Sequence, residues 1–168
     1  MAYEVGLELD CDEVQLTLLR LGGTLHDVGK LAIPDSILNK PGRLTDDELR
    51  EVRAHPELGA RMVALDPALR PALPAVLHHH ERWDGAGYPS GKSGTAIPFE
   101  ARILAVVDSY DAMTSDRPYR AALPTEQAVF EVERCAGTQF DPDVAVAFLA
   151  AWESGAFGVT AALRAAAG

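Results

Sequence analysis

Apolar residues recur at helical spacing along most of the chain, and short stretches rich in Gly, Pro and Asp separate the helical segments. The first predicted helix follows the capping-box arrangement Asp10-Cys11-Asp12-Glu13. Its apolar positions are Val14, Leu18, Leu21 and Leu25. This helix carries His26 and Asp27 at its C-terminal end, before Gly29 breaks it.

Six more segments are predicted to be helical, and proline or a capping residue opens nearly all of them. They are a short turn 35–38 that Asp35 can cap, 45–55 after the capping box Thr45-Asp46-Asp47-Glu48, 57–65 after Pro56, 74–81 after Pro74, 99–114 after Pro98 and 125–135 capped by Thr125. Asp141-Pro142 begins another, which ends near Trp152. Residues 84–91 are too rich in turn residues to form regular structure.

No segment has the strict alternation of a strand, and no internal repeat or linker divides the chain. The pattern therefore predicts a single all-α domain of about six to eight helices over residues 1–154. The Ala- and Gly-rich residues 155–168 are expected to form a tail or a frayed helix.

The composition is that of an ordinary globular protein: 48% of the 168 residues are apolar, and both charge signs are well represented. No run approaches the roughly 18 apolar residues of a membrane span, and the N-terminal residues do not resemble a signal peptide. Cys11 and Cys135 are too few and too far apart for a disulfide framework. We therefore expect a cytoplasmic protein without membrane insertion.

The net charge of −10 argues against a DNA or RNA polymer as a partner, because polyphosphates select basic surfaces. A small phosphate ligand is compatible with this charge. Part of the acid excess can be local, since carboxylates that bind metal count as negative until the metal arrives.

The five histidines lie in only three places, and these places carry the chemistry. His26 precedes Asp27, His55 stands alone, and three histidines follow one another at 78–80. Imidazole is the commonest protein ligand of metals, and carboxylates complete such sites. Asp108 follows an apolar run, where a carboxylate is costly unless a cation or donor meets it, and Asp111 shares its helix face.

Taken singly, each of these features has an ordinary explanation. His55 before a proline is typical of a surface or capping histidine, three adjacent histidines can be an exposed helix end, and a His-Asp pair arises by chance. Together with the glycine-rich loop of residues 84–91 and the arginines at 117 and 120, however, these features are improbable as a coincidence. Arg117 and Arg120 could nevertheless pair with nearby acids on a solvated turn.

The order and spacing of the motifs resemble the HD-GYP domain, the branch of the HD metallophosphohydrolases linked to cyclic di-GMP breakdown. The segments that carry the resemblance are Leu25-His26-Asp27-Val28-Gly29-Lys30, Ile33-Pro34-Asp35, residues 79–89, 101–103, 108–120 and 137–142. The match extends from about Leu21 to Phe148, which makes it far more specific than a His-Asp doublet.

The resemblance implies a site with two divalent metal ions, iron or manganese. The metal ligands that it implies are His26, Asp27, His55, His79, His80 and Asp108, with Asp27 bridging the ions. Asp27 and Lys30 would have catalytic roles. The residues implied around the substrate are Lys30, Asp111, Thr114, Arg117 and Arg120, and those of the name-giving loop are Gly85, Gly87, Tyr88 and Pro89.

Four residues in or beside these segments keep simpler interpretations. His78 lies outside the two-histidine motif, so we expect it behind the ligands or on the surface. Trp83 is expected to pack rather than to stack on a ligand. Tyr88 and Pro89 could pack the loop without any ligand.

The resemblance also suggests that helices normally found before the equivalent of Met1 are missing here. Their absence would remove ligands for a third metal and leave an apolar groove, which would favour a homodimer or a signalling protein partner.

Three functions are then open. The first is a phosphodiesterase that hydrolyses the bacterial second messenger cyclic di-GMP to pGpG and/or GMP. The second is a weak or inactive module that binds cyclic di-GMP or a partner protein. An HD hydrolase of another nucleotide is the third, and the Gly-Tyr-Pro loop disfavours it.

Overall fold

The computed structural model describes residues 1–116 and 121–158, which form an all-α domain as predicted. Its α-helices are α1 (Ala2–Glu8), α2 (Glu13–Leu25), α3 (Asp35–Leu38), α4 (Asp46–Arg53), α5 (His55–Ala64), α6 (Leu73–His78), α7 (Phe99–Thr114), α8 (Thr125–Arg134) and α9 (Pro142–Glu153). Three short 3₁₀ helices join them: η1 (Val28–Ala32), η2 (Arg70–Ala72) and η3 (Gly94–Ala96). Within the described ranges, the β pairing is limited to one isolated bridge between Ala136 and Phe140.

The helix starts follow local capping chemistry, with corrections to the prediction. The capping box at Thr45 and Glu48 is confirmed. The box before α2 is formed by Asp12 and Gln15 rather than by Asp10 and Glu13, because Asp10 lies in the turn after α1 with a positive φ of 52°. Reciprocal bonds of 2.8 and 3.0 Å join Asp12 and Gln15.

Proline also precedes helices where the sequence suggested a polar cap. Pro34 and Pro124 occupy the N-cap positions of α3 and α8, so Asp35 and Thr125 are the first helical residues instead. The Asp141 cap of α9 is confirmed, because its carboxylate accepts a bond from the Asp143 amide at 2.9 Å.

Helix α1 was not predicted from the apolar pattern. It is only seven residues long and has no side-chain cap, so its local signals are weak. Packing on α2 and α9 holds it, and the Val5 side chain is fully buried there.

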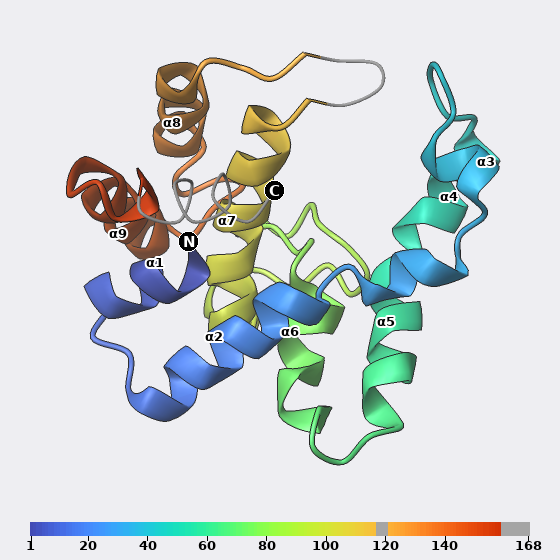
Figure 1. The fold of residues 1–168 in the computed structure, drawn as a ribbon, viewed down its shortest axis with the longest axis horizontal. Coiled ribbons are helices and arrows are strands. Elements are labelled where there is room, and N and C mark those ends of the chain that lie inside the picture. The colour runs from blue at the N-terminus through green and yellow to red at the C-terminus, as the bar shows by residue number, and fades with distance from the viewer. Residues whose placement is uncertain (117–120, 159–168) are drawn as a thin grey trace.

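Two apolar clusters organise the packing. The larger cluster lies between α1, α2, α7, α8 and α9 and includes Phe148, which is fully buried and contacts the rings of Tyr110 and Phe157. A smaller cluster joins α5, η2 and α6 around Val63 and Val76. Helix α7 runs through the middle of the molecule and packs on α2, α6, α8 and α9 (Figure 1).

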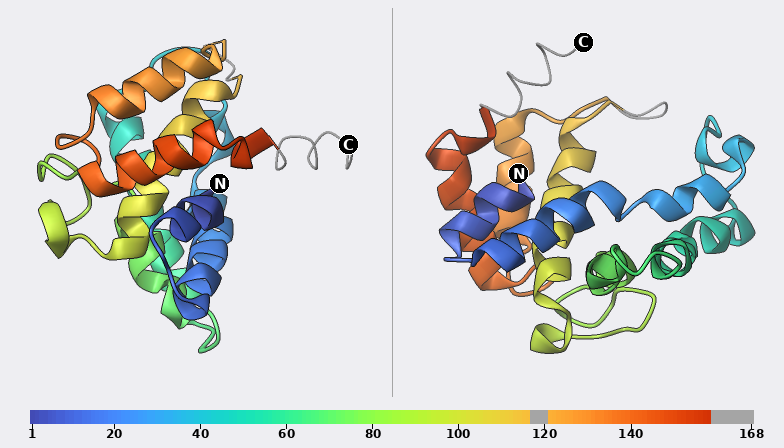
Figure 2. Two further views of the ribbon diagram at one scale, coloured as in Figure 1. Left: turned by 90° about the vertical axis from the view of Figure 1, so that its left-hand side faces the viewer. Right: turned by 60° about the horizontal axis from the view of Figure 1, so that its bottom comes forward.

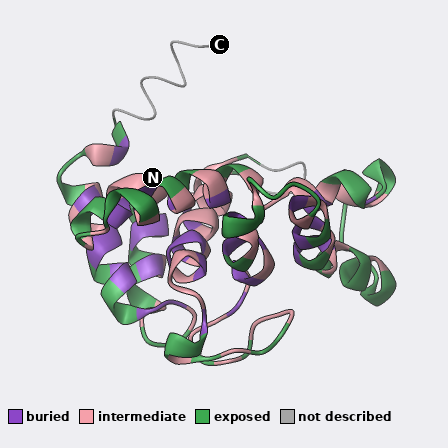
Figure 3. Ribbon diagram, turned by 90° about the horizontal axis from the view of Figure 1, so that it is seen from below, coloured by how far each residue is buried: buried purple, intermediate pink, exposed green. Residues whose placement is uncertain are grey.

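Helices α3 and α4 form an arm that projects away from both clusters (Figures 1 and 2). Neither helix contains a buried residue, and the arm is coloured mainly as exposed or intermediate in Figure 3. The arm leads directly into α5 and therefore into His55.

A buried ion pair fixes the start of α9 against α7. Arg102 Nη1 lies 2.5 Å from Asp141 Oδ2, and the Asp141 side chain is 2% exposed. The same carboxylate thus pairs with a charge on α7 and caps α9, which couples the two helices.

Phe157 packs into the larger cluster, so the first residues of the predicted tail adjoin the core. Residues 159–168 lie outside the described residues, and the boundary at 154 stays a prediction. None of the described helices is long and apolar enough to cross a membrane.

The larger cluster should dominate stability. We expect Phe148→Ala to lower the free energy of unfolding by about 3–5 kcal/mol, because it leaves a cavity among rings that cannot collapse onto it. Phe130→Ala is the matched control: that ring is 59% exposed, so the change should stay within about 0.5 kcal/mol. Urea denaturation followed by circular dichroism measures both, and equal losses would contradict this view of the core.

Candidate metal centre

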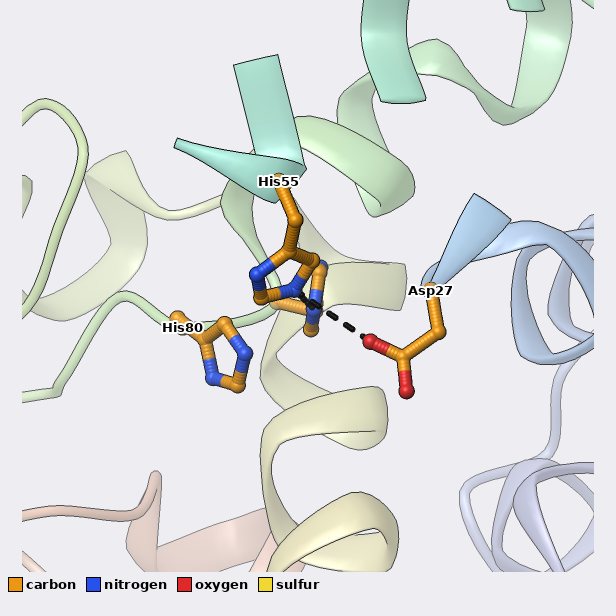
Figure 4. A group of neighbouring side chains, drawn as sticks. Asp27, His55 and His80 are labelled. Atoms are coloured by element: carbon orange, nitrogen blue, oxygen red, sulfur yellow. Dashed lines mark hydrogen bonds and ion pairs between the residues drawn. The ribbon is translucent and has the colours of Figure 1, made fainter. Parts of the chain in front are cut away.

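The six residues predicted as metal ligands come from four parts of the chain, and the structure brings them together. His26 ends α2, Asp27 follows it, and His55 begins α5. His79 and His80 follow α6, and Asp108 lies on α7. Figure 4 shows Asp27, His55 and His80 around one small space, with a contact from His55 to Asp27.

The ligand atoms fall into two groups, each within 4.8 Å. One group contains Asp27, His55, His79 and His80, and the other contains His26, Asp27 and Asp108. Asp27 belongs to both. Its Oδ1 lies 3.2 Å from His55 Nε2, and its Oδ2 lies 3.6 Å from His26 Nε2.

Three of the histidines are oriented by the same local hydrogen bond. Nδ1 of His26, His55 and His79 lies 2.8–2.9 Å from the backbone carbonyl oxygen three residues earlier. A carbonyl oxygen only accepts, so each Nδ1 carries the proton and each Nε2 presents its lone pair. This is the arrangement in which imidazole ligates a metal, with the second nitrogen held by the protein.

The lone pairs meet one another in the centre. His55 Nε2 lies 3.2 Å from His79 Nε2 and 3.2 Å from Asp27 Oδ1. That oxygen is buried and accepts no well-formed hydrogen bond from the described residues. Acceptors this close repel one another unless a cation lies between them. The donor set therefore fits metal ions, which these six residues would hold.

Burial and charge set the protonation states needed for metal binding. Burial, with His80 and His26 nearby, lowers the pKa of His79 to about 3, and burial lowers the pKa of His80 to about 4. Burial raises the pKa of Asp27, but the Lys30 ammonium, which donates to Oδ2, outweighs it and brings the pKa well below its usual range. At neutral pH these two imidazoles are neutral and the carboxylate is ionised.

His26 and Asp108 interact across the second group. His26 Nε2 lies 3.6 Å from Asp108 Oδ1. Burial opposes both charged forms, but their mutual attraction prevails, so the pKa of His26 is raised and that of Asp108 is lowered.

His80 is held by the glycine loop rather than by a carbonyl. The Tyr88 ring stacks on the His80 ring with centroids 4.9 Å apart, and the Tyr88 amide donates to the His80 carbonyl at 3.2 Å. Burial raises the pKa of the Tyr88 phenol to about 12. Gly87 lets the loop return this closely, since a Cβ there would lie 2.3 Å from the Arg82 nitrogen.

Glu81 anchors this loop, a role that sequence reasoning missed. Its side chain is fully buried and accepts hydrogen bonds from the backbone amides of Ser90, at 2.7 Å, and Lys92, at 3.1 Å. The available signal was an acidic residue directly after two predicted ligands. His78 is also buried, 3.4 Å from Glu81, and belongs to neither ligand group.

Two glycines bring Asp27 to His55. A Cβ on Gly29 would lie 1.9 Å from the His55 carbonyl oxygen and 2.5 Å from the Gly59 nitrogen, so η1 and α5 touch backbone to backbone. The sequence suggested only that Gly29 ends a helix. Its larger effect is to place Asp27, two residues earlier, against the α5 N-terminus.

The residues predicted around the substrate are placed less uniformly. Lys30 Nζ donates to Asp27 Oδ2 at 2.5 Å, and Asp111 lines a cavity with Asp108. The Thr114 hydroxyl donates to the Tyr110 carbonyl at 2.9 Å, at the end of α7. Arg117 and Arg120 lie outside the described residues. Trp83 is half-buried, and its amide donates to the Gln139 carbonyl.

Two cavities adjoin the centre. One, of about 340 Å³, lies between α1, α2 and α7 and is bounded by His26, Asp27 and Asp108. The other, of about 190 Å³, lies beneath the glycine loop and is bounded by His79, His80 and Tyr88.

The sequence has clear relatives. The profile of the HD domain family matches residues 1–144. A cyclic di-GMP phosphodiesterase of Thermotoga maritima is 43% identical over 151 residues, which cover 89% of this chain and 41% of the relative. One of Pseudomonas aeruginosa is 51% identical over 133 residues, which cover 78% of this chain and 32% of the relative. The chain thus spans less than half the length of these relatives.

A solved structure shares the fold. It is a cyclic GMP-AMP specific phosphodiesterase of Vibrio cholerae, which superposes with a TM-score of 0.68 at 20% sequence identity. The superposition covers 93% of this chain and 42% of that protein.

The backbone contact at Gly29 can be tested by adding one methyl group. We expect Gly29→Ala to push η1 away from α5, to lower the free energy of unfolding by at least about 1–3 kcal/mol and to reduce bound metal. Elemental analysis and denaturation measure the two effects. Gly158→Ala is the control, because nothing lies within 4 Å of its Cβ position. Full metal content in Gly29→Ala would show that the contact does not position Asp27.

The anchor at Glu81 predicts a local effect. Glu81→Gln replaces one acceptor oxygen by an amide donor, so one of the two loop amides loses its partner. We expect faster hydrogen exchange at that amide, Ser90 or Lys92, with about 1–3 kcal/mol less protection. Glu133→Gln, on the exposed face of α8, should leave this exchange unchanged. Unaltered exchange in both variants would disprove the anchor.

Proposed function

Because the chain belongs to the HD domain family, which also confirms the resemblance drawn from its motifs, we propose that it is a metal-dependent phosphodiesterase of cyclic di-GMP. The observation that carries this proposal is the convergence of six His and Asp ligands, three of them with Nε2 lone pairs turned inward by carbonyl bonds. Homologues named cyclic di-GMP phosphodiesterases at 43% and 51% identity support the choice of substrate.

Two divalent ions, iron or manganese, suit the donor set. The two ligand groups share only Asp27, which supports a carboxylate bridging two ions. All six ligands offer nitrogen or oxygen, and Cys11 and Cys135 are not among them. When bound, such ions supply a hydroxide nucleophile and neutralise the phosphodiester oxygens.

The residues of the chain prepare the site for phosphodiester hydrolysis. Asp27 is kept ionised, and His79 and His80 are kept neutral, so all three are ready to ligate at neutral pH. Lys30 contacts Asp27 and places a cation beside the position a phosphodiester would take. Water opens one P–O3′ bond and leaves a 5′-phosphate, so the first product is pGpG, and a second hydrolysis gives GMP.

Catalysis is favoured over a binding module because all six predicted ligands are present and converge. A module that only binds cyclic di-GMP or a partner protein does not need the inward-facing lone pairs. A homodimer or a signalling partner remains a separate prediction, as does a cytoplasmic location.

The experiment measures pGpG and GMP release from cyclic di-GMP by protein loaded with iron or manganese. We expect Asp27→Ala to lower kcat by at least about 10³-fold, because it removes the ligand common to both groups. Glu153→Ala, an exposed acid at the end of α9, should retain full activity. Elemental analysis of protein purified without chelator should give two ions per chain, and fewer in Asp27→Ala.

The contrary results are distinct. Nucleotide binding without turnover in either metal would refute the enzyme and leave the binding module. Turnover of 3′3′-cGAMP in preference to cyclic di-GMP would keep the phosphodiesterase and overturn the substrate.

A further inference from the structure

The cavity between α1, α2 and α7 opens directly onto the metal centre. His26, Asp27 and Asp108 line it, and so do Tyr3 and Arg20. Figure 1 shows α2 passing across α7 with α1 beside it. Part of a substrate bound at the metal centre can therefore extend into this cavity.

The volume of this cavity is large enough for only part of a cyclic dinucleotide. At about 340 Å³ it lies at the lower end of ligand pockets, roughly 300–1,000 Å³, so it holds one nucleoside rather than a whole cyclic dinucleotide. Leu104 and Val107 give it an apolar side, as a flat aromatic base requires. Gly23 leaves room there, since a Cβ would meet only Leu104, at 3.8 Å.

Arg20 supplies the polar recognition. It is the one arginine or lysine among the described residues that line this cavity. Its guanidinium carbon lies 4.1 Å from the Tyr3 ring centroid, which orients the donors before any ligand arrives. The paired donors of arginine match the O6 and N7 acceptors of guanine. Adenine presents an amino donor in place of O6 and cannot accept both bonds.

We propose that this cavity is a guanine pocket, in which Arg20 binds the O6 and N7 edge of one base while the adjoining phosphodiester lies at the metal centre. The inference deepens the proposed phosphodiesterase function and rests on it for the substrate. It assigns the preference for guanine to α2, a helix that also carries His26.

Two other cavities with basic side chains are weaker candidates for this base. The cavity beneath the glycine loop is lined by Arg53 and Arg82, but at about 190 Å³ it is smaller than ligand pockets of roughly 300–1,000 Å³. The second lies within the α3–α4 arm and is lined by Lys30, Lys40 and Arg43. Glu48 neutralises Lys40 through contacts of 2.7 and 2.9 Å. Of the predicted metal ligands and the residues beside them, only Lys30 lines the cavity in the arm. The cavity at Arg20 borders three ligands directly.

The first variant tests recognition. Arg20→Ala should lower the ratio of kcat/KM for cyclic di-GMP over cyclic di-AMP about tenfold, because one bidentate contact is lost. The loss should appear in KM, with kcat nearly unchanged, since Arg20 does not touch the reacting phosphate. Arg61→Ala removes the same charge from an exposed site on α5 and should leave the ratio unchanged.

The second variant fills the cavity. Gly23→Leu should lower kcat/KM for cyclic di-GMP by more than tenfold, whereas Thr24→Leu adds the same side chain on an exposed face and should have no effect. Because the Gly23 carbonyl holds His26, metal content is measured as well. If Gly23→Leu loses activity but keeps its metal, the result supports filling of the cavity. If Gly23→Leu loses its metal and Arg20→Ala leaves the ratio of kcat/KM for cyclic di-GMP over cyclic di-AMP unchanged, the pocket is refuted.

Equilibrium titration separates this inference from the proposed function. Wild-type protein should bind 5′-GMP at least tenfold more tightly than 5′-AMP, and Arg20→Ala should abolish the difference. Guanine-selective binding without hydrolysis would refute the phosphodiesterase and keep the pocket. Hydrolysis with a selectivity that neither Arg20→Ala nor Gly23→Leu alters would refute the pocket and keep the phosphodiesterase.

Discussion

The proposed metal centre depends on the backbone contact between Gly29 and the start of α5. No side chain fits there, since a Cβ on Gly29 would lie 1.9 Å from the His55 carbonyl oxygen. The contact brings the end of α2 to the beginning of α5 and so places Asp27 Oδ1 3.2 Å from His55 Nε2. The two ligand groups share Asp27, so a displacement of η1 would separate both from their common carboxylate.

The centre is electrostatically unfavourable until a cation enters it. Carbonyl bonds orient His55 and His79 with their Nε2 atoms 3.2 Å apart, and both residues are 1% exposed, so water does not screen them. A buried acceptor without a donor costs about 1–3 kcal/mol. The two apolar clusters and the Arg102–Asp141 pair offset this cost, because they hold the helices in place independently of the ligands.

The sequence predicted features with local causes. Proline and capping residues fixed the starts of α4, α7 and α9, and the ligands stood out because the histidines lie in only three places and Asp108 follows an apolar run. Features that depend on distant segments were missed or assigned incompletely. Helix α1 forms by packing on α2 and α9, Glu81 matters through a loop that folds back on it, and Gly29 matters through α5. None of these contacts has a signature within its own segment.

Helix α2 links the centre to the neighbouring cavity. Arg20, Gly23 and His26 follow at intervals of three residues, so they lie on one side of the helix. The Gly23 carbonyl orients His26, while its missing side chain leaves the cavity open. At Gly23 the backbone carbonyl therefore orients a metal ligand, while the absence of a side chain leaves room for the base. Because the two roles use different atoms, substitutions on this face of α2 can alter the choice of base while the ligand geometry is retained.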